Sequence, residues 1–242
     1  MRRTFAIICC LIGITACDKH DPILPGVRTA IFDTKHLEIK NQTITDVPTE
    51  TFVVDNSNCP YTQDASNIIW DGPRKIFSGF PTNHTVKSDM RPVCAGGYLY
   101  AGLTTGELIK LNPRNRQIIW IADIYSPSNM TGGASMVDIV VPPFPHGPAV
   151  YAGGLGNAFC RINANSGTRV WCIELSVSTA FIIAGNYAFV VADDDNLYAV
   201  NLADGSVYWR TPVSERVAPT YLDGVITVGR DRVDVSSGKI IL

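Results

Sequence analysis

The sequence has 242 residues, with 20 Lys and Arg against 22 Asp and Glu, so its formal net charge at pH 7 is −2. This balance excludes the positive field that a nucleic-acid-binding surface needs, and we expect no nucleic-acid partner. Beyond the first sixteen residues, no apolar stretch reaches the length of a membrane span.

The N-terminus has the order of parts found in bacterial lipoproteins. Arg2 and Arg3 precede an apolar run of about ten residues, 5–14, which is too short to cross a bilayer as a helix. The following Ile-Thr-Ala-Cys17 resembles a lipobox, in which the signal peptide is cut before the cysteine and the cysteine is lipidated. An ordinary signal peptide with an incidental cysteine, or an uncleaved anchor, is the alternative.

This resemblance sets the expected domain limits. We expect a signal peptide over residues 1–16, a lipidated cysteine and flexible tether over 17–45, and a folded domain over 46–242. Part of the tether, such as residues 36–41, could form a strand. Each buried methylene of an acyl chain contributes about 0.8 kcal/mol, so a triacylated Cys17 would hold the protein at a membrane. The outer membrane is expected, although Asp18 directly after the cysteine is an inner-membrane retention signal in some bacteria.

One motif recurs through the second half of the sequence. It begins with Asn or Asp, ends eight residues later in Trp, and has Gly midway in the later copies. The copies start at Asn112, Asn163, Asn201 and Asp234, and the fourth ends in Leu242 instead of Trp. Self-similarity at a spacing of roughly 35 to 50 residues indicates a repeat architecture.

Short apolar strands separated by Gly, Asn and Asp turns surround each motif. The expected strands are 98–102, 107–111, 117–121, 149–153, 158–162, 168–173, 180–183, 187–192, 196–200 and 206–210. Even spacing of this kind indicates an all-β sandwich or propeller, and a four-stranded unit of about 40 residues is a propeller blade. A ring would be closed by a strand at 51–54 or 68–70 that completes the last blade.

The segments 187–209 and 149–171 resemble PQQ-like repeats, named after pyrroloquinoline quinone. Asn196-Leu-Tyr-Ala-Val-Asn-Leu-Ala-Asp-Gly-Ser-Val-Tyr-Trp209 is a near-complete match to the repeat. The resemblance implies an all-β propeller of four-stranded PQQ-like blades. About four to five blades fit this chain, fewer than the eight usual in the family, so the ring can be incomplete.

Together with the lipobox, the repeats resemble the propeller lipoproteins of the machinery that inserts β-barrels into the bacterial outer membrane. The resemblance implies a non-catalytic scaffold without cofactor, whose partner is the barrel-forming subunit. In that family an Asp-x-Asp-x-x-Pro loop contacts the partner. Asp138-Ile-Val-Val-Pro-Pro143 keeps part of the pattern, so Asp138 is the candidate contact residue, with local capping of backbone amides as the alternative.

Two other functions remain open. One is a propeller lipoprotein that binds another periplasmic protein or a sugar. The other is a quinone-dependent dehydrogenase, but such enzymes use a ring disulfide between adjacent cysteines, and the adjacent Cys9 and Cys10 lie in the signal peptide.

Several conspicuous residues have structural interpretations. The motif tryptophans should fill the space between blades. Gly153-Gly154-Leu-Gly156 lacks the following helix of a dinucleotide site. Asp193-Asp-Asp195 occupies a hairpin turn and lacks the spaced oxygen ligands of a calcium loop, so no metal site is expected.

Four cysteines follow the lipobox, which permits two disulfides in an oxidising compartment. Cys160 and Cys172 lie six residues on either side of Ser166, so a hairpin there would place them opposite each other and allow a bridge. A register slip of one residue would instead leave two thiols on different faces. For Cys59 and Cys94 the sequence alone does not determine the pairing.

Overall fold

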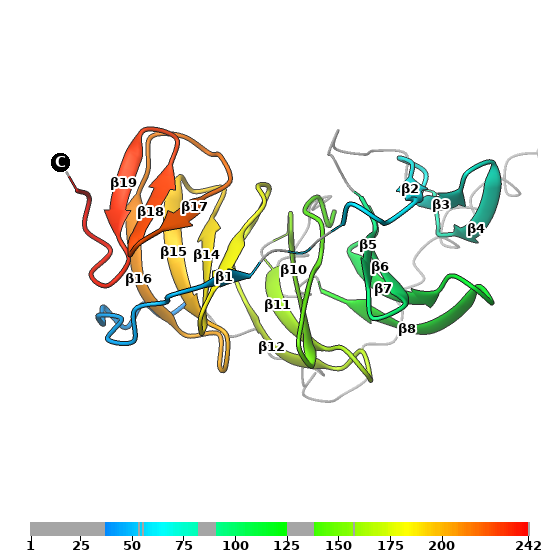
Figure 1. The fold of residues 1–242 in the computed structure, drawn as a ribbon, viewed down its shortest axis with the longest axis horizontal. Coiled ribbons are helices and arrows are strands. Elements are labelled where there is room, and N and C mark those ends of the chain that lie inside the picture. Colours follow the sequence, from blue (N-terminus) through cyan, green and yellow to red (C-terminus); the bar gives the residue numbers. More distant parts are fainter. Residues whose placement is uncertain are drawn as a thin grey trace, which may run out of the picture. The chain divides into compact units, whose positions relative to one another are not determined.

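The computed structural model describes residues 37–52, 54, 56–81, 91–124, 138–156 and 158–241. The chain divides into two compact units, 1–33 and 34–242, and the second contains all the described residues. Every regular element in those residues is a β-strand, and the strands form five antiparallel sheets that follow one another along the chain (Figure 1).

We number the sheets first to fifth in chain order. The first contains β2 (Tyr61–Gln63), β3 (Ile68–Asp71) and β4 (Arg74–Ser78). The second contains β5 (Val93–Ala95), β6 (Tyr98–Gly102), β7 (Glu107–Asn112) and β8 (Gln117–Asp123). The third contains β9 (Phe144–His146), β10 (Ala149–Gly154), β11 (Ala158–Asn163) and β12 (Arg169–Ile173). The fourth contains β1 (Thr51–Phe52), β13 (Ile182–Ala184), β14 (Tyr187–Val191), β15 (Asn196–Asn201) and β16 (Val207–Pro212). The fifth contains β17 (Thr220–Leu222), β18 (Val225–Val228) and β19 (Asp231–Asp234).

These sheets are propeller blades, which confirms the predicted fold class. In the second and third sheets, four consecutive strands pair in chain order, as the repeats predicted. The hairpin of β14 and β15 pairs Tyr187 with Asn201 and Val191 with Leu197, so the positions expected for both strands were right. The first sheet was not predicted as a blade.

The motif tryptophans pack between successive sheets. Trp120, Trp171 and Trp209 are only 4–7% exposed. Each indole N–H donates at 3.1 Å to a carbonyl of the next sheet's motif, on Ala164, Leu202 and Val235 respectively. Their predicted structural role is therefore confirmed.

The midway glycine of the motif has two independent reasons to be glycine. Gly167, Gly205 and Gly238 have φ of 70–75°, in the left-handed region that side chains disfavour. A Cβ on any of them would also lie only 2.6–2.8 Å from the tryptophan ring of the preceding sheet. Both the turn and the contact between sheets therefore require glycine at this position of the motif.

The segment before β1 packs on the later sheets. The backbone N–H groups of Lys40 and Gln42 donate to the carbonyls of Val207 and Tyr208 on β16, both at 2.9 Å. Ile44 is completely buried. The folded part therefore begins before the expected boundary at residue 46, because residues 37–45 form part of the packed structure and not of a free tether.

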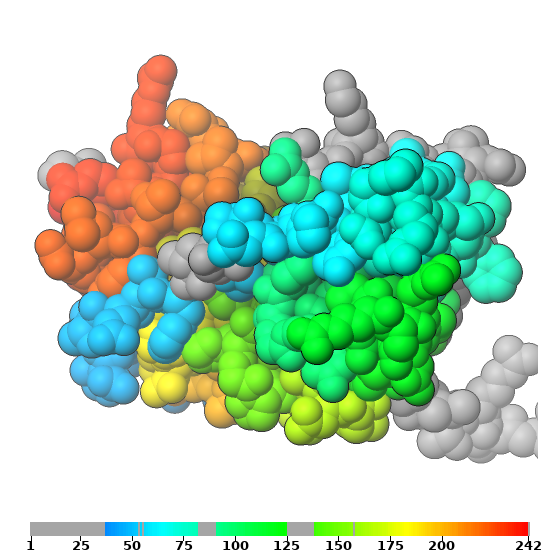
Figure 2. Space-filling view, turned by 45° about the vertical axis from the view of Figure 1, so that its right-hand side comes forward, coloured from blue at the N-terminus to red at the C-terminus, as the bar shows by residue number. Residues whose placement is uncertain are grey.

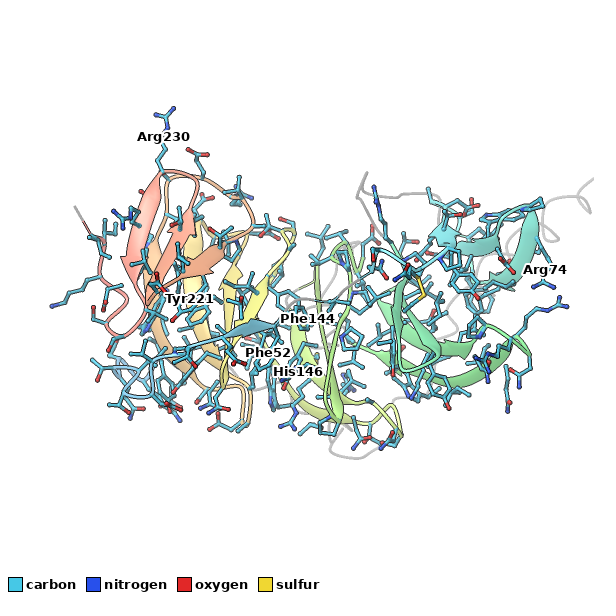
Figure 3. The ribbon with its side chains drawn as sticks, in the orientation of Figure 1. Phe52, Arg74, Phe144, His146, Tyr221 and Arg230 are labelled. Carbon is cyan, nitrogen blue, oxygen red and sulfur yellow. A yellow bond between two sulfur atoms is a disulfide. The ribbon has the colours of Figure 1, made fainter. Side chains whose placement is uncertain are left out.

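The prediction that a strand at residues 51–54 or 68–70 completes the last blade is wrong. Thr51 and Phe52 form β1, which pairs with β13 in the fourth sheet, and residues 68–70 belong to the first sheet. Phe52 reaches the third sheet, where its ring centroid lies 4.2 Å from that of His146 (Figure 3).

The fifth sheet is bound by the segment upstream of β1. Ile44 N–H donates to the Ser236 carbonyl at 2.8 Å, and the Ser236 hydroxyl donates back to the Ile44 carbonyl at 2.7 Å. The Tyr221 hydroxyl, labelled in Figure 3, donates to the Pro48 carbonyl. These bonds join residues that lie far apart in the sequence and that no described strand pairing connects.

Candidate functional site

The segment that begins at Asp138 joins the second and third sheets. The Asp138 carbonyl accepts a hydrogen bond from Leu155 N–H at 2.8 Å, and Ile139 N–H donates to the Leu103 carbonyl at 3.2 Å. Asp138 is 3% exposed and Ile139 is fully buried. Asp138 was predicted to contact a partner, but in this conformation its side chain does not face solvent.

Two glycines allow this segment to approach the sheets so closely. A Cβ on Gly102 would lie 2.3 Å from the Ile139 side chain, and one on Gly154 would lie 2.3 Å from the Asp138 carbonyl oxygen. Gly154 ends β10, and the chain then turns into the neighbouring β11. Gly153-Gly154 therefore serves backbone packing in a β-hairpin.

Beyond Val141 the chain lines a cavity of about 480 Å³. Its walls are mostly apolar and include Val93, Phe144 and Phe181, with Arg91 as a charged lining residue. The Phe144 and Phe181 ring centroids are 5.8 Å apart. A largely apolar hollow of this size with a few polar groups has the character of a binding site. No sequence pattern predicts this hollow, because its walls come from segments far apart in the chain.

Two cationic side chains, the buried Lys110 and the half-buried Arg161, support the contacts between sheets. The Lys110 ammonium donates to the Ala164 carbonyl at 2.7 Å, the same oxygen that accepts the Trp120 N–H, and it lies 4.2 Å from the Tyr98 ring centroid. Burial lowers the pKa of Lys110. Arg161, at the equivalent position of β11, donates to the Leu202 carbonyl at 3.2 Å. These groups hold adjacent blades together.

The three aspartates of the turn before β15 are used within the protein. Asp193 accepts from the Ser176 hydroxyl at 2.7 Å, Asp194 accepts from the Tyr198 hydroxyl at 2.5 Å, and Asp195 accepts from Arg216 at 2.6 Å. Burial and the bond to Asp194 raise the pKa of Tyr198 to about 12. The carboxylates thus stabilise the turn.

Two cysteine pairs are joined in the structure. Cys160 and Cys172 face each other across β11 and β12, with Cα atoms 4.1 Å apart, and their sulfurs are bonded. Cys59 and Cys94 form a second disulfide, with Cα atoms 5.4 Å apart. The predicted lipidation site, Cys17, lies outside the described residues.

In the part of the chain that the structure describes, no group of three or more His, Cys, Asp or Glu side chains is placed to hold a metal ion. Within the same residues, no helix has the length and apolar character needed to cross a membrane.

Comparison with solved structures supports the fold. The crystal structure of BamB from Moraxella catarrhalis matches with a TM-score of 0.54 at 14% identity, over 81% of this chain and 66% of that one.

Curated relatives match at low identity. The outer membrane protein assembly factor BamB of Alkalilimnicola ehrlichii is 23% identical over 145 residues, covering 60% of this chain and 37% of that protein. The same factor of Vibrio cholerae is 27% identical over 124 residues, covering 51% and 32%. The chain thus spans between about one third and two fifths of these relatives' length. A family model described as outer membrane protein assembly factor BamB matches residues 38–234, and the chain belongs to that family of PQQ-like repeat proteins.

Proposed function

We propose that this protein is a non-catalytic periplasmic scaffold that takes part in the assembly of β-barrel proteins into the outer membrane. The observation that carries the proposal is the family match over residues 38–234, together with relatives whose names describe outer membrane protein assembly. We further propose the barrel-forming subunit of the assembly complex as the partner. The contacts of Lys110, Arg161 and Asp193 support a scaffold, because they hold blades and turns together.

The proposed contact region is the loop that starts at Asp138 and ends at Phe144. Backbone bonds to Leu103 and Leu155 fix the start of this loop, and its end lines the cavity beside Arg91. Asp138 is buried, so its proposed role is to hold the loop in a shape that the partner recognises.

Co-purification tests this function. A tagged full-length chain, extracted from membranes in mild detergent, should bring the barrel-forming subunit with it. Asp138→Asn should reduce recovery of that subunit, while the matched change at the exposed turn residue Asp223 should not. Recovery of the chain without any assembly component would refute the proposal, and equal recovery by both variants would remove Asp138 from it.

We also propose that the mature protein begins at Cys17 and is anchored to the outer membrane by acyl chains on that residue. Growth with an alkyne-bearing fatty acid should label the protein, and Cys17→Ala should abolish the label. Equal labelling of both forms would rule out this anchor.

Reproducible quinone-dependent oxidation of an alcohol or sugar by the purified protein would contradict its proposed lack of catalysis.

A further inference from the structure

The outer strand of the second sheet, β8, has an apolar side that no described strand covers. It is the last strand of its sheet, with β7 on one side only. Ile118, Ile119 and Ile121 on β8 are 42%, 39% and 49% exposed, although isoleucine is usually buried. In Figure 2 the green surface of the second sheet faces the viewer.

The outer strands of the other sheets are protected in different ways. β4 carries the exposed charges of Arg74 and Lys75, and β19 forms a bridge through Val233 to Ile240. Counted from the motif tryptophan, β12 carries Arg169 at the position of Ile118 and the buried Cys172 at that of Ile121, so Val170, 51% exposed, has no exposed apolar residue at either of these positions. Charges and covering segments are the usual means by which proteins prevent strand addition at a sheet edge.

The fourth sheet shows what such an edge binds in this fold. Val207 of β16 stands at the position of Ile118, and it is only 1% exposed. Ile39 forms a parallel bridge with Val207, and the N–H groups of Lys40 and Gln42 donate to the carbonyls of Val207 and Tyr208. An extended segment with an apolar residue therefore covers the β16 edge.

The backbones of β8 and β16 share an irregularity in their pairing. Both strands pair with the preceding strand through a register shift at the same point, between Lys110 and Leu111 in one case and between Ala199 and Val200 in the other. The carbonyls equivalent to those that accept the N-terminal segment belong to Ile118 and Ile119. The β8 edge thus offers both acceptors and apolar side chains.

We propose that β8 binds an extended segment of a partner polypeptide, with apolar residues at alternate positions, which adds to the second sheet as a further strand. Strand addition combines backbone hydrogen bonds with side-chain contacts at every second residue. This inference adds detail to the proposed scaffold function. It rests on that function only in identifying the partner as a protein of the assembly process.

A labelled eight-residue peptide of alternating valine and threonine, blocked at both ends, is the probe. Its binding to the purified mature protein is measured by fluorescence anisotropy. The double variant Ile119→Lys, Ile121→Lys should bind about tenfold more weakly or worse, because lysines at a strand edge oppose strand addition. Leu222→Lys is the matched control, since Leu222 is 73% exposed in the fifth sheet, and it should bind like the wild type.

A peptide with two valines replaced by proline should not bind, because proline cannot donate to a ladder. Absence of saturable binding by the wild type, or equal binding by the wild type and the double variant, would overturn the inference. It would also fail if sedimentation showed that the wild type dimerises through β8 and the double variant does not, because the occupant would then be a second copy. The peptide assay uses purified protein and does not depend on the assembly complex. If the peptide binds but co-purification recovers no assembly component, the proposed function is refuted and this inference stands.

Discussion

The junction between the first and second sheets is held differently from the three junctions that follow it. At each later junction a tryptophan ring packs on the turn of the next sheet and donates to its backbone. In the first sheet the register position of the motif tryptophan is held by Phe77 on β4, whereas Trp70 lies on β3 and donates to Asp64 in the same sheet, at 2.9 Å. The first junction has the Cys59–Cys94 disulfide and polar bonds through Asn67.

The turn that the first sheet would meet explains this difference. In the second sheet the motif starts at Asn112, and the position of the midway glycine is taken by Arg116, which is exposed with φ of 60°. A side chain there would collide with a ring placed as Trp171 is on Gly205. A tryptophan can therefore join two blades only if the next turn carries glycine, and other contacts hold the first junction.

Removal of an intersheet tryptophan should have the largest effect. Trp171→Ala should lower the free energy of unfolding by about 3–5 kcal/mol, because it leaves a cavity and removes one of the two hydrogen bonds that the Leu202 carbonyl accepts. Trp70→Ala should cost clearly less, since Trp70 is only half-buried and binds within its own sheet. Thermal melts of both variants compare the two junctions, and equal losses would contradict the distinction.

The disulfide of the first junction should matter next. It closes a loop with a sequence separation of 35, so replacing Cys59 and Cys94 with serine should cost about 4 kcal/mol. The first sheet should then exchange its amide hydrogens faster than the other sheets. The same change at Cys160 and Cys172, separated by 12 residues within one sheet, should lower the free energy of unfolding by about 3 kcal/mol. The faster amide exchange should then spread over the third sheet. Faster exchange throughout the chain in the first variant would show that this bridge is not local.

Asn67 tests the polar part of the same junction. It is fully buried, its amide donates to the Thr104 hydroxyl and the Phe80 carbonyl, and its side-chain oxygen accepts from Thr104 N–H. Asn67→Ala should destabilise the protein by about 1–3 kcal/mol, because buried partners are left unsatisfied. Asn115→Ala in an exposed turn is the control, and a similar loss in both would exclude a special role for the buried amide.

High pH should affect the fourth sheet in particular. Burial and the bond to Asp194 raise the pKa of Tyr198 to about 12, whereas an unfolded tyrosine ionises near 10. Between these values the native state binds more protons than the unfolded state, so stability falls as the pH rises from about 10 to 12. Tyr198→Phe should make this fall shallower in melts recorded across that range. Leu222→Ala changes no titrating group and should leave the fall unchanged, and an identical pH profile for both variants would contradict the assignment.

Much of the fold could be predicted because each blade is built from local hairpins. The strands around the motifs at Asn163 and Asn201, and the burial of their tryptophans, follow from alternation, turn residues and repetition. The first sheet was missed because its strands carry no copy of the motif. Asp138 was selected by a family pattern, and its burial follows from contacts with Leu103 and Leu155 that no pattern displays.

The sequence by itself determined the fold class, the blade repeat and the family, because hairpin pairing and turn chemistry depend on residues close together in the chain. Only the tertiary structure decided where residues 37–52 lie, which cysteine pairs with Cys59, and that no described strand covers the outer edge of β8. The Tyr221–Pro48 bond spans 173 residues. Contacts of that separation depend on how whole sheets pack, and apolar alternation within a segment shows which face is buried but not what covers it.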